Sequence, residues 1–285
     1  MKLFLSLSCL AAGLCHAQAQ RDFSSVEIKA TTVSQNVFMM EGAGGNIGVS
    51  AGPDGILIVD NQFAPLAEKI AAALKKLNPG KLKFVLNTHW HGDHTGGNAF
   101  FGAEAHIVAH TNVRKRLASS RDPKKEALPV ITFDQSLSVH FNGEEIKVIH
   151  LPPGHTDGDS VIHFTKANVV HMGDQFFAGR FPFIDLGSGG SVAGYIANVG
   201  EVLKKIPADA KIIPGHGPLA TVDDLRTFHS MLVETSEIVS KAHAEGKTLE
   251  AVKAAGLPEK YKDWGSGFIN TSRWLEIIYN NLPKK

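Results

Sequence analysis

Residues 87–97, with the sequence NTHWHGDHTGG, place four metal-ligand side chains close together: His89, His91, Asp93 and His94. The apolar run FVL comes directly before this segment, so the motif should lie on a loop at the end of a buried strand. Such a group is unfavourable by itself, because its members lose hydration when gathered and repel one another when charged. A bound metal ion would relieve both effects, and the spacing therefore predicts a metal site.

Three more candidate ligands follow at the ends of later apolar runs. His155 lies in PPGHTDGDS, Asp174 in HMGDQFF and His216 in IIPGHG. Neighbouring glycines let the backbone turn sharply and keep Cβ atoms from crowding a metal. Strand ends at one edge of a sheet are also where α/β proteins gather their sites. A lone histidine is usually structural, but this ordered set is typical of a metal centre.

The donor types suit two zinc ions per chain. One site would use three imidazoles and keep a fourth position open for water, as a catalytic zinc needs: His89, His91 and His155. The other would mix a carboxylate with imidazoles: Asp93, His94 and His216. Asp174 could bridge the two ions at the ~3.5–4 Å spacing of paired catalytic metals.

The elements that must position these residues are strands followed by helices, and this order occurs twice along the chain. Short apolar runs separated by Gly, Asn, Pro and Asp predict several hairpins before a helix each time. Helices are expected over residues 64–77 and 191–206, and a long helix should begin after Thr221, which fits a capping box with Asp224. An α/β fold with two mixed sheets face to face and helices outside would bury such strands.

With these residues in place, the sequence resembles the metallo-β-lactamase superfamily. Five ordered motifs of that family match this chain at Asp60, HWHGDH (89–94), His155, Asp174 and His216. The match covers most of the chain, from about residue 33 to about residue 221. It implies an αββα sandwich of two mixed β-sheets flanked by helices, with a dinuclear site at one edge. It also implies that Asp60 is not a ligand but supports the histidine loop, a role common around metals.

The first residues of the 285-residue chain have the layout of a secretory signal peptide, in which a basic residue, an apolar stretch and small residues follow in order. Residues 1–19 are therefore expected to be removed, after Ala17 or Ala19, and the protein to be exported to the periplasm or secreted. The remainder, residues 20–285, should form a single domain with a helical tail from about residue 221 to residue 285. Both cysteines lie in the leader, so no thiolate ligand would remain.

The composition points to a small-molecule substrate rather than a macromolecular partner. The formal net charge is +1, and the densest basic patch, RKR at residues 114–116, is too short for a nucleic-acid surface. We expect that patch to be a solvated helix face. No membrane segment is expected after leader removal, and no obligatory protein partner is evident.

Departures from subfamily patterns narrow the activity that the resemblance implies. The commonest zinc β-lactamases carry a cysteine at the position of Asp174 and a lysine three residues later, where this chain has Phe177. An aspartate there is similar to glyoxalase II and to lactonases. Glyoxalase II binds glutathione through basic residues in its C-terminal helices, and no clear basic cluster follows Thr221. The expected activity is zinc-dependent hydrolysis of an ester, lactone or lactam, β-lactams included.

In the expected mechanism, zinc lowers the pKa of a bound water from about 15.7 towards ~7, and Asp93 orients the hydroxide for attack on a carbonyl. The three-histidine zinc would polarise the carbonyl oxygen. Two alternatives stay open. One is a mononuclear iron oxygenase of the persulfide dioxygenase type, and the other is a non-catalytic zinc-binding protein.

The segment after Asp174, QFFAGRFPFIDLGSGGS, is the candidate substrate wall. Arg180 could pair with a substrate carboxylate, a geometry that suits guanidinium, and Phe177 could face the metals. The earlier EGAGGNIGV is a candidate hairpin flap over the site, with residues 42–45 at its tip.

Overall fold

The computed structural model describes residues 22–283, so the expected signal peptide at residues 1–19 lies outside the described residues. Seven strands form the first sheet, in the order of the sequence. They are β1 (Lys29–Ser34), β2 (Val37–Glu41), β3 (Ile47–Gly52), β4 (Gly55–Val59), β5 (Leu82–Leu86), β6 (His106–His110) and β7 (Ile131–Phe133). The strands β1 to β4 pair antiparallel and β4 to β7 pair parallel, so this sheet is mixed.

The second sheet has six strands in the order β13-β12-β11-β10-β9-β8. They are β8 (Ser136–Phe141), β9 (Glu144–His150), β10 (Ser160–Phe164), β11 (Val169–His171), β12 (Lys211–Ile213) and β13 (Ala220–Thr221). All neighbours pair antiparallel except β11 and β12, which are parallel. The helix between β11 and β12 provides the crossover that a parallel pair requires.

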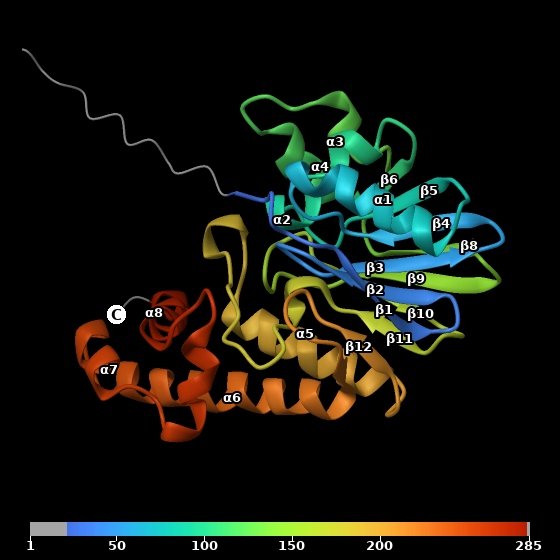
Figure 1. Cartoon of the computed structure of the whole chain (residues 1–285). Helices are drawn as coiled ribbons and strands as arrows, with labels where there is room; N and C mark the ends of the chain where they lie inside the picture. Colours follow the sequence, from blue (N-terminus) through green and yellow to red (C-terminus); the bar gives the residue numbers. More distant parts are fainter. Residues whose placement is uncertain (1–21, 284–285) are drawn as a thin grey trace, which may run out of the picture.

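Helices cover the outer faces of both sheets, with α1, α3 and α4 on one side and α5 and α6 on the other (Figure 1). The α-helices are α1 (Ala67–Leu77), α2 (Gly92–Thr95), α3 (Asn98–Phe101), α4 (Thr111–Ala118), α5 (Val192–Lys205), α6 (Val222–Ala244), α7 (Leu249–Ala255) and α8 (Thr271–Asn281). The 3-10 turns are η1 (Ala64–Leu66), η2 (Lys125–Ala127), η3 (Gly173–Gln175), η4 (Leu186–Ser188) and η5 (Glu259–Ser266). The capping box of Thr221 and Asp224 is present at the start of α6, as predicted.

Three apolar layers hold the sandwich together. In β4 the side chain of Leu57 points between the sheets with Phe164, whereas Ile58 points outward to meet Ile70 of α1. This alternation follows from the two-residue period of a strand. The third layer, which includes Phe228, lies between the second sheet and the helices α5, α6 and α8. The predicted αββα sandwich is therefore confirmed.

The candidate ligands lie on loops that follow strands of both sheets. The histidine loop follows β5, His155 follows β9, Asp174 lies in η3 after β11, and His216 follows β12. Within residues 22–283, no helix is long and apolar enough to cross a membrane.

Candidate metal centre

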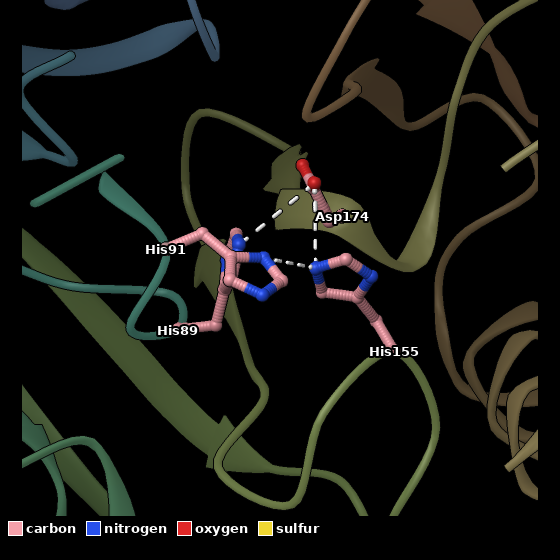
Figure 2. A group of neighbouring side chains, drawn as sticks. All are labelled: His89, His91, His155 and Asp174. Carbon is pink, nitrogen blue, oxygen red and sulfur yellow. Dashed lines mark hydrogen bonds and ion pairs between the residues drawn. The ribbon is translucent and has the colours of Figure 1, made fainter. Parts of the chain in front are cut away.

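Two clusters of ligand-type atoms form at this edge of the sandwich. The first contains His89, His91, His155 and Asp174, and the second contains Asp93, His94 and His216. Within each cluster the ligand atoms lie within 4.8 Å of one another. Figure 2 shows the first cluster, in which His89 and His91 come from the same loop and converge with His155 and the carboxylate of Asp174, which come from two others. The structure thus brings all seven predicted ligands together in the two expected groups.

Asp60 connects the clusters to the first sheet and is fully buried. Its carboxylate accepts hydrogen bonds from the Thr88 N–H at 2.8 Å and the Thr88 hydroxyl at 2.7 Å. The third partner is His94 Nδ1, also at 2.7 Å. The φ of Asp60 is +63°, which is uncommon for a residue with a side chain and common at functional sites. Asp60 therefore lies behind the histidine loop and orients it.

Hydrogen bonds on the outer nitrogens fix which atoms of the imidazoles face the centre. His94 Nδ1 faces the carboxylate of Asp60, which can only accept, so this nitrogen carries the proton. His155 Nδ1 donates to the backbone carbonyl of Phe183 at 2.7 Å. The Thr88 hydroxyl donates to Asp60 and so accepts from His89 Nδ1 at 3.0 Å. In His89 and His155 the unprotonated Nε2 is left for a metal, and in His94 Nε2 is the nitrogen that faces the centre.

Asp185 orients His91, the remaining histidine of the first cluster. It was not among the residues predicted from the sequence. Its Oδ2 lies 3.0 Å from His91 Nε2, so His91 turns Nδ1 towards the centre. The Ser188 hydroxyl and N–H also bind this carboxylate, at 2.6 Å and 3.1 Å. Although burial opposes it, these bonds from Ser188, followed by that from His91, lower the pKa of Asp185. The only sequence signal was a carboxylate in the segment that follows Asp174.

The inward-facing atoms are arranged as a metal site requires. His155 Nε2 and His91 Nδ1 lie 2.8 Å apart, although the bonds on their other nitrogens leave both as acceptors. Two lone pairs at this distance repel unless a positive charge binds them. His89 Nε2 is buried without a hydrogen-bond partner, which is unfavourable unless another species satisfies it, and Asp174 Oδ1 faces His94 Nε2 at 3.0 Å and His216 Nε2 at 3.4 Å. The donor set therefore fits divalent metal ions.

Electrostatics favour the metal-binding protonation state of two histidines and of Asp174. Burial lowers the pKa of His155 to about 4 and that of His89 well below its usual value, so both rings are neutral at pH 7. Although burial opposes it, the neighbouring histidines, His94 foremost, hold the pKa of Asp174 well below its usual range. Neutral imidazole and ionised carboxylate are the forms that bind metals. Although burial opposes it, the carboxylates of Asp174, Asp93 and Asp60 raise the pKa of His94 well above its usual value, so a metal would displace a proton from that ring.

The centre is open to solvent on one side only. The side chains of Asp93, His216 and His91 are 28%, 20% and 15% exposed, whereas that of Asp174 is 5% exposed. The rings of His89, His94 and His155 are buried. A small molecule could therefore reach the ligand cluster from the side of Asp93, His216 and His91.

The two predicted substrate contacts lie in different places. Phe177 stacks on His216 with ring centroids 5.0 Å apart, and it is 6.3 Å from His155, so it forms part of the wall of the centre. Arg180 is exposed and extends along Gly267, where a Cβ would lie 3.1 Å from its Cδ. The side chain of Arg180 therefore leads towards the C-terminal tail.

The glycine-rich hairpin between β2 and β3 is packed against the histidine loop and is not a free flap. The Gly45 N–H donates to the Asp93 carbonyl at 3.1 Å, and Gln62 Nε2 donates to the Gly45 carbonyl at 2.8 Å. A Cβ on Gly45 would lie 2.1 Å from His94 Cε1. The flap expectation was wrong because the hairpin is fixed by these contacts and supports the second cluster.

The basic patch at residues 114–116 is also more than a solvated helix face. Arg116 makes two bonds of 2.7 Å to the carboxylate of Asp157, two residues after His155. Its guanidinium also lies 5.8 Å from the ring centre of Trp90, between two ligands of the histidine loop. Arg116 therefore links α4 to both ligand loops, a role that the charge pattern alone did not indicate.

Comparison with known proteins identifies the family to which this chain belongs. The family model described as the metallo-beta-lactamase superfamily matches residues 30–216, well over half of the chain. The chain belongs to the metallo-beta-lactamase superfamily. Membership of the superfamily agrees with a hydrolase-like protein that has a His/Asp metal-binding site.

Curated relatives of this superfamily member carry different names. The hydroxyacylglutathione hydrolase of Gloeobacter violaceus is 27% identical over 192 residues, which are 67% of this chain and 70% of that protein. The 2,4-dinitroanisole O-demethylase subunit alpha of Nocardioides sp. is 28% identical over 131 residues, 45% of this chain and 40% of that protein. Superfamily membership therefore leaves the substrate open.

Solved structures agree on the fold. The crystal structure of DIM-1 metallo-beta-lactamase superimposes with a TM-score of 0.63 at 19% identity, over 73% of this chain and 99% of that one. At this identity, the likeness concerns the fold.

Proposed function

We propose that this superfamily member is a dinuclear zinc hydrolase that cleaves a carbonyl substrate, namely an ester, a lactone or a lactam. The observation that carries the proposal is the facing pair of acceptor nitrogens, His155 Nε2 and His91 Nδ1, 2.8 Å apart beside His89 Nε2, which is buried without a hydrogen-bond partner. A bound metal cation makes this arrangement favourable, because it satisfies these nitrogens together.

The two clusters would hold one zinc ion each, with Asp174 between them. Zinc held there would supply Lewis acidity for a carbonyl oxygen and make a water molecule acidic enough to lose its proton near neutral pH. A donor set of imidazoles and carboxylates without thiolates suits zinc, and the carboxylate of Asp174 lies within 3.4 Å of nitrogens from both clusters.

The side chains on the open face would act on the water and the substrate. The Asp93 carboxylate is the most exposed of the seven ligand-type groups, and its Oδ2 lies 3.4 Å from His216 Nε2. It can therefore orient an attacking water and accept its proton. Asp60 and Asp185 would keep the ligand rings in place, and Phe177 would exclude water from one face of His216.

The test is to measure metal content and turnover together. Zinc-loaded protein lacking residues 1–19 should bind two zinc ions and hydrolyse at least one of a chromogenic cephalosporin, a p-nitrophenyl ester and a lactone. The expected kcat/KM on its preferred class exceeds ~10⁴ M⁻¹s⁻¹. His91→Ala should remove turnover while leaving the fold intact, and His140→Ala, an exposed histidine of β8, should change neither.

Other outcomes would favour the alternatives. One iron per chain together with oxygen consumption would indicate an oxygenase. Two bound zinc ions without turnover of any of the three substrate classes would indicate a metal-binding protein. Full activity in His91→Ala would contradict the assignment of the centre.

A further inference from the structure

The open face of the centre continues into an aromatic surface that the proposed chemistry does not use. Phe183 is half-buried, and its ring centre lies 5.9 Å from that of His91 and 6.0 Å from that of His155. Its carbonyl also accepts the hydrogen bond from His155 Nδ1. The ring of Phe183 is therefore held beside two ligands of the first cluster.

Phe268 extends this surface outward from the C-terminal tail. Its ring lies 6.4 Å from that of Phe183 in an edge-to-face arrangement, yet its exposed fraction is 89%. Among the described residues, no other large apolar side chain is so exposed. We call Phe183 and Phe268 the aromatic ledge.

The backbone around Phe268 is held in place although its ring is exposed. The next residue, Ile269, is 4% exposed and belongs to the apolar layer beneath the second sheet. On the other side, the carbonyl of Trp264 accepts a 3.0 Å hydrogen bond from the Phe181 N–H. An aromatic ring presented by a fixed backbone loses little entropy on binding a ligand. Core packing does not account for the position of this ring, because it is 89% exposed and its ring contact is with the half-buried Phe183.

The charges of the tail do not suit an anionic substrate group. Between residues 253 and 273, each lysine and arginine forms an ion pair with a glutamate: Lys253 and Arg273 with Glu276, Lys260 with Glu234, and Lys262 with Glu259. Arg180, beside Gly267, adds a single exposed cation near the ledge. The surface next to the centre is therefore mainly aromatic, and apolar contact is its main means of binding.

We propose that the aromatic ledge binds an apolar alkyl or aryl group of the substrate next to the cleaved bond. This inference rests on the proposed hydrolase function and narrows its substrate class. The preferred substrates are esters or lactones with an apolar chain, and a glutathione thioester, with its charged peptide, fits the ledge poorly. Phe268 is then a specificity-determining residue supplied by the helical tail.

The test uses p-nitrophenyl acetate, butyrate, hexanoate and octanoate with the zinc-loaded protein. Complete burial of a methylene group would raise kcat/KM about fourfold. The ledge covers only one side of an alkyl chain, so kcat/KM should rise about twofold per added methylene. Phe268→Ser should flatten this dependence through KM, with a larger loss for octanoate than for acetate, and should leave the fold intact, since the ring is 89% exposed. Phe268→Leu should retain most of the dependence.

Val130→Ser is the matched control, because Val130 is an exposed apolar residue (66%) just before β7 rather than on the tail. It should keep the full dependence on chain length. Calorimetric binding of octanoate and of acetate provides a readout that needs no turnover. Octanoate should bind more tightly, and Phe268→Ser should remove the difference.

These measurements separate the ledge from the hydrolase function. Ester hydrolysis that is independent of chain length, or a dependence that survives in Phe268→Ser, would overturn the ledge and leave the hydrolase standing. An absence of ester, lactone and cephalosporin hydrolysis with octanoate binding that still depends on Phe268 would overturn the hydrolase and support the ledge as a binding surface. An absence of hydrolysis together with octanoate binding that does not depend on Phe268 would overturn both proposals.

Discussion

At the scale of single residues, the centre depends on the groups that hold each ligand ring as much as on the ligands. His91 is the most exposed ring of the first cluster, with a side chain that is 15% exposed. Its orientation depends on Asp185, whose Oδ2 lies 3.0 Å from His91 Nε2. Residues that orient ligands in this way typically contribute 10- to 100-fold to metal affinity or activity.

We therefore expect Asp185→Asn to weaken zinc binding in the first cluster by about 10- to 100-fold, with a parallel loss of kcat. The amide keeps the size of the carboxylate but loses the charge that keeps the proton on His91 Nε2. Competition with a chelating dye would measure the affinity. Asp209→Asn, an exposed aspartate that binds the side chain of Asn168, is the control and should change nothing. Wild-type zinc affinity in Asp185→Asn would mean that the ring needs no such partner.

The metal ligands could be predicted from the sequence, whereas Asp185 could not. The ligands could be found because their chemistry is local: a histidine within H-x-H-x-D-H or between glycines is unusual by itself. Asp185 is an ordinary carboxylate whose role arises only when the loop after Asp174 folds back onto His91, 94 residues earlier in the chain. For Arg180 the residue type suggested a role, and the structure places its side chain along Gly267, so its pairing with a substrate carboxylate stays a prediction.

At the scale of elements, the sequence predicted the buried strands and the long helices, but it missed the edge strand β1. The apolar runs of β2 to β6 mark strands that lie between two layers, and β4 is buried along its length. By contrast, β1 was missed because four of its six residues are exposed and it has no apolar run. The packing of the β2–β3 hairpin could not be predicted either, because glycine is equally compatible with a free flap and with a close approach.

The close approach of this hairpin gives a prediction for two glycines near the same cluster. Gly45→Ala should reduce zinc binding at the second cluster and lower kcat by about tenfold or more, because its Cβ would lie 2.1 Å from His94 Cε1. Gly92→Ala is the matched control within the HWHGDH motif. A Cβ there would meet no atom within 4 Å, so metal content and activity should be unchanged. Equal behaviour of the two variants would show that the hairpin does not support the centre.

At the scale of the whole molecule, aromatic contacts join the helical tail to the sandwich, and that of Trp274 is the most deeply buried among those of α8. Trp274 of α8 is fully buried and stacks on Phe181 with ring centroids 5.8 Å apart. Its Nε1 donates to the Thr235 hydroxyl of α6 at 3.0 Å. Phe181 belongs to the segment that follows Asp174, so the tail packs against the loop that carries a ligand. The tail and the sandwich should therefore unfold together.

Trp274→Ala should lower the free energy of unfolding by ~3–5 kcal/mol, as expected when a large buried ring is removed, with a single transition in urea. Phe268→Ala removes an aromatic ring from the same tail, but that ring is 89% exposed, so the free energy should change by less than about 0.5 kcal/mol. If the tail were a separate unit, Trp274→Ala would instead give two transitions and leave zinc affinity intact. In one cooperative unit, the same variant should also weaken zinc binding, because Phe181 loses the surface that fixes the loop after Asp174.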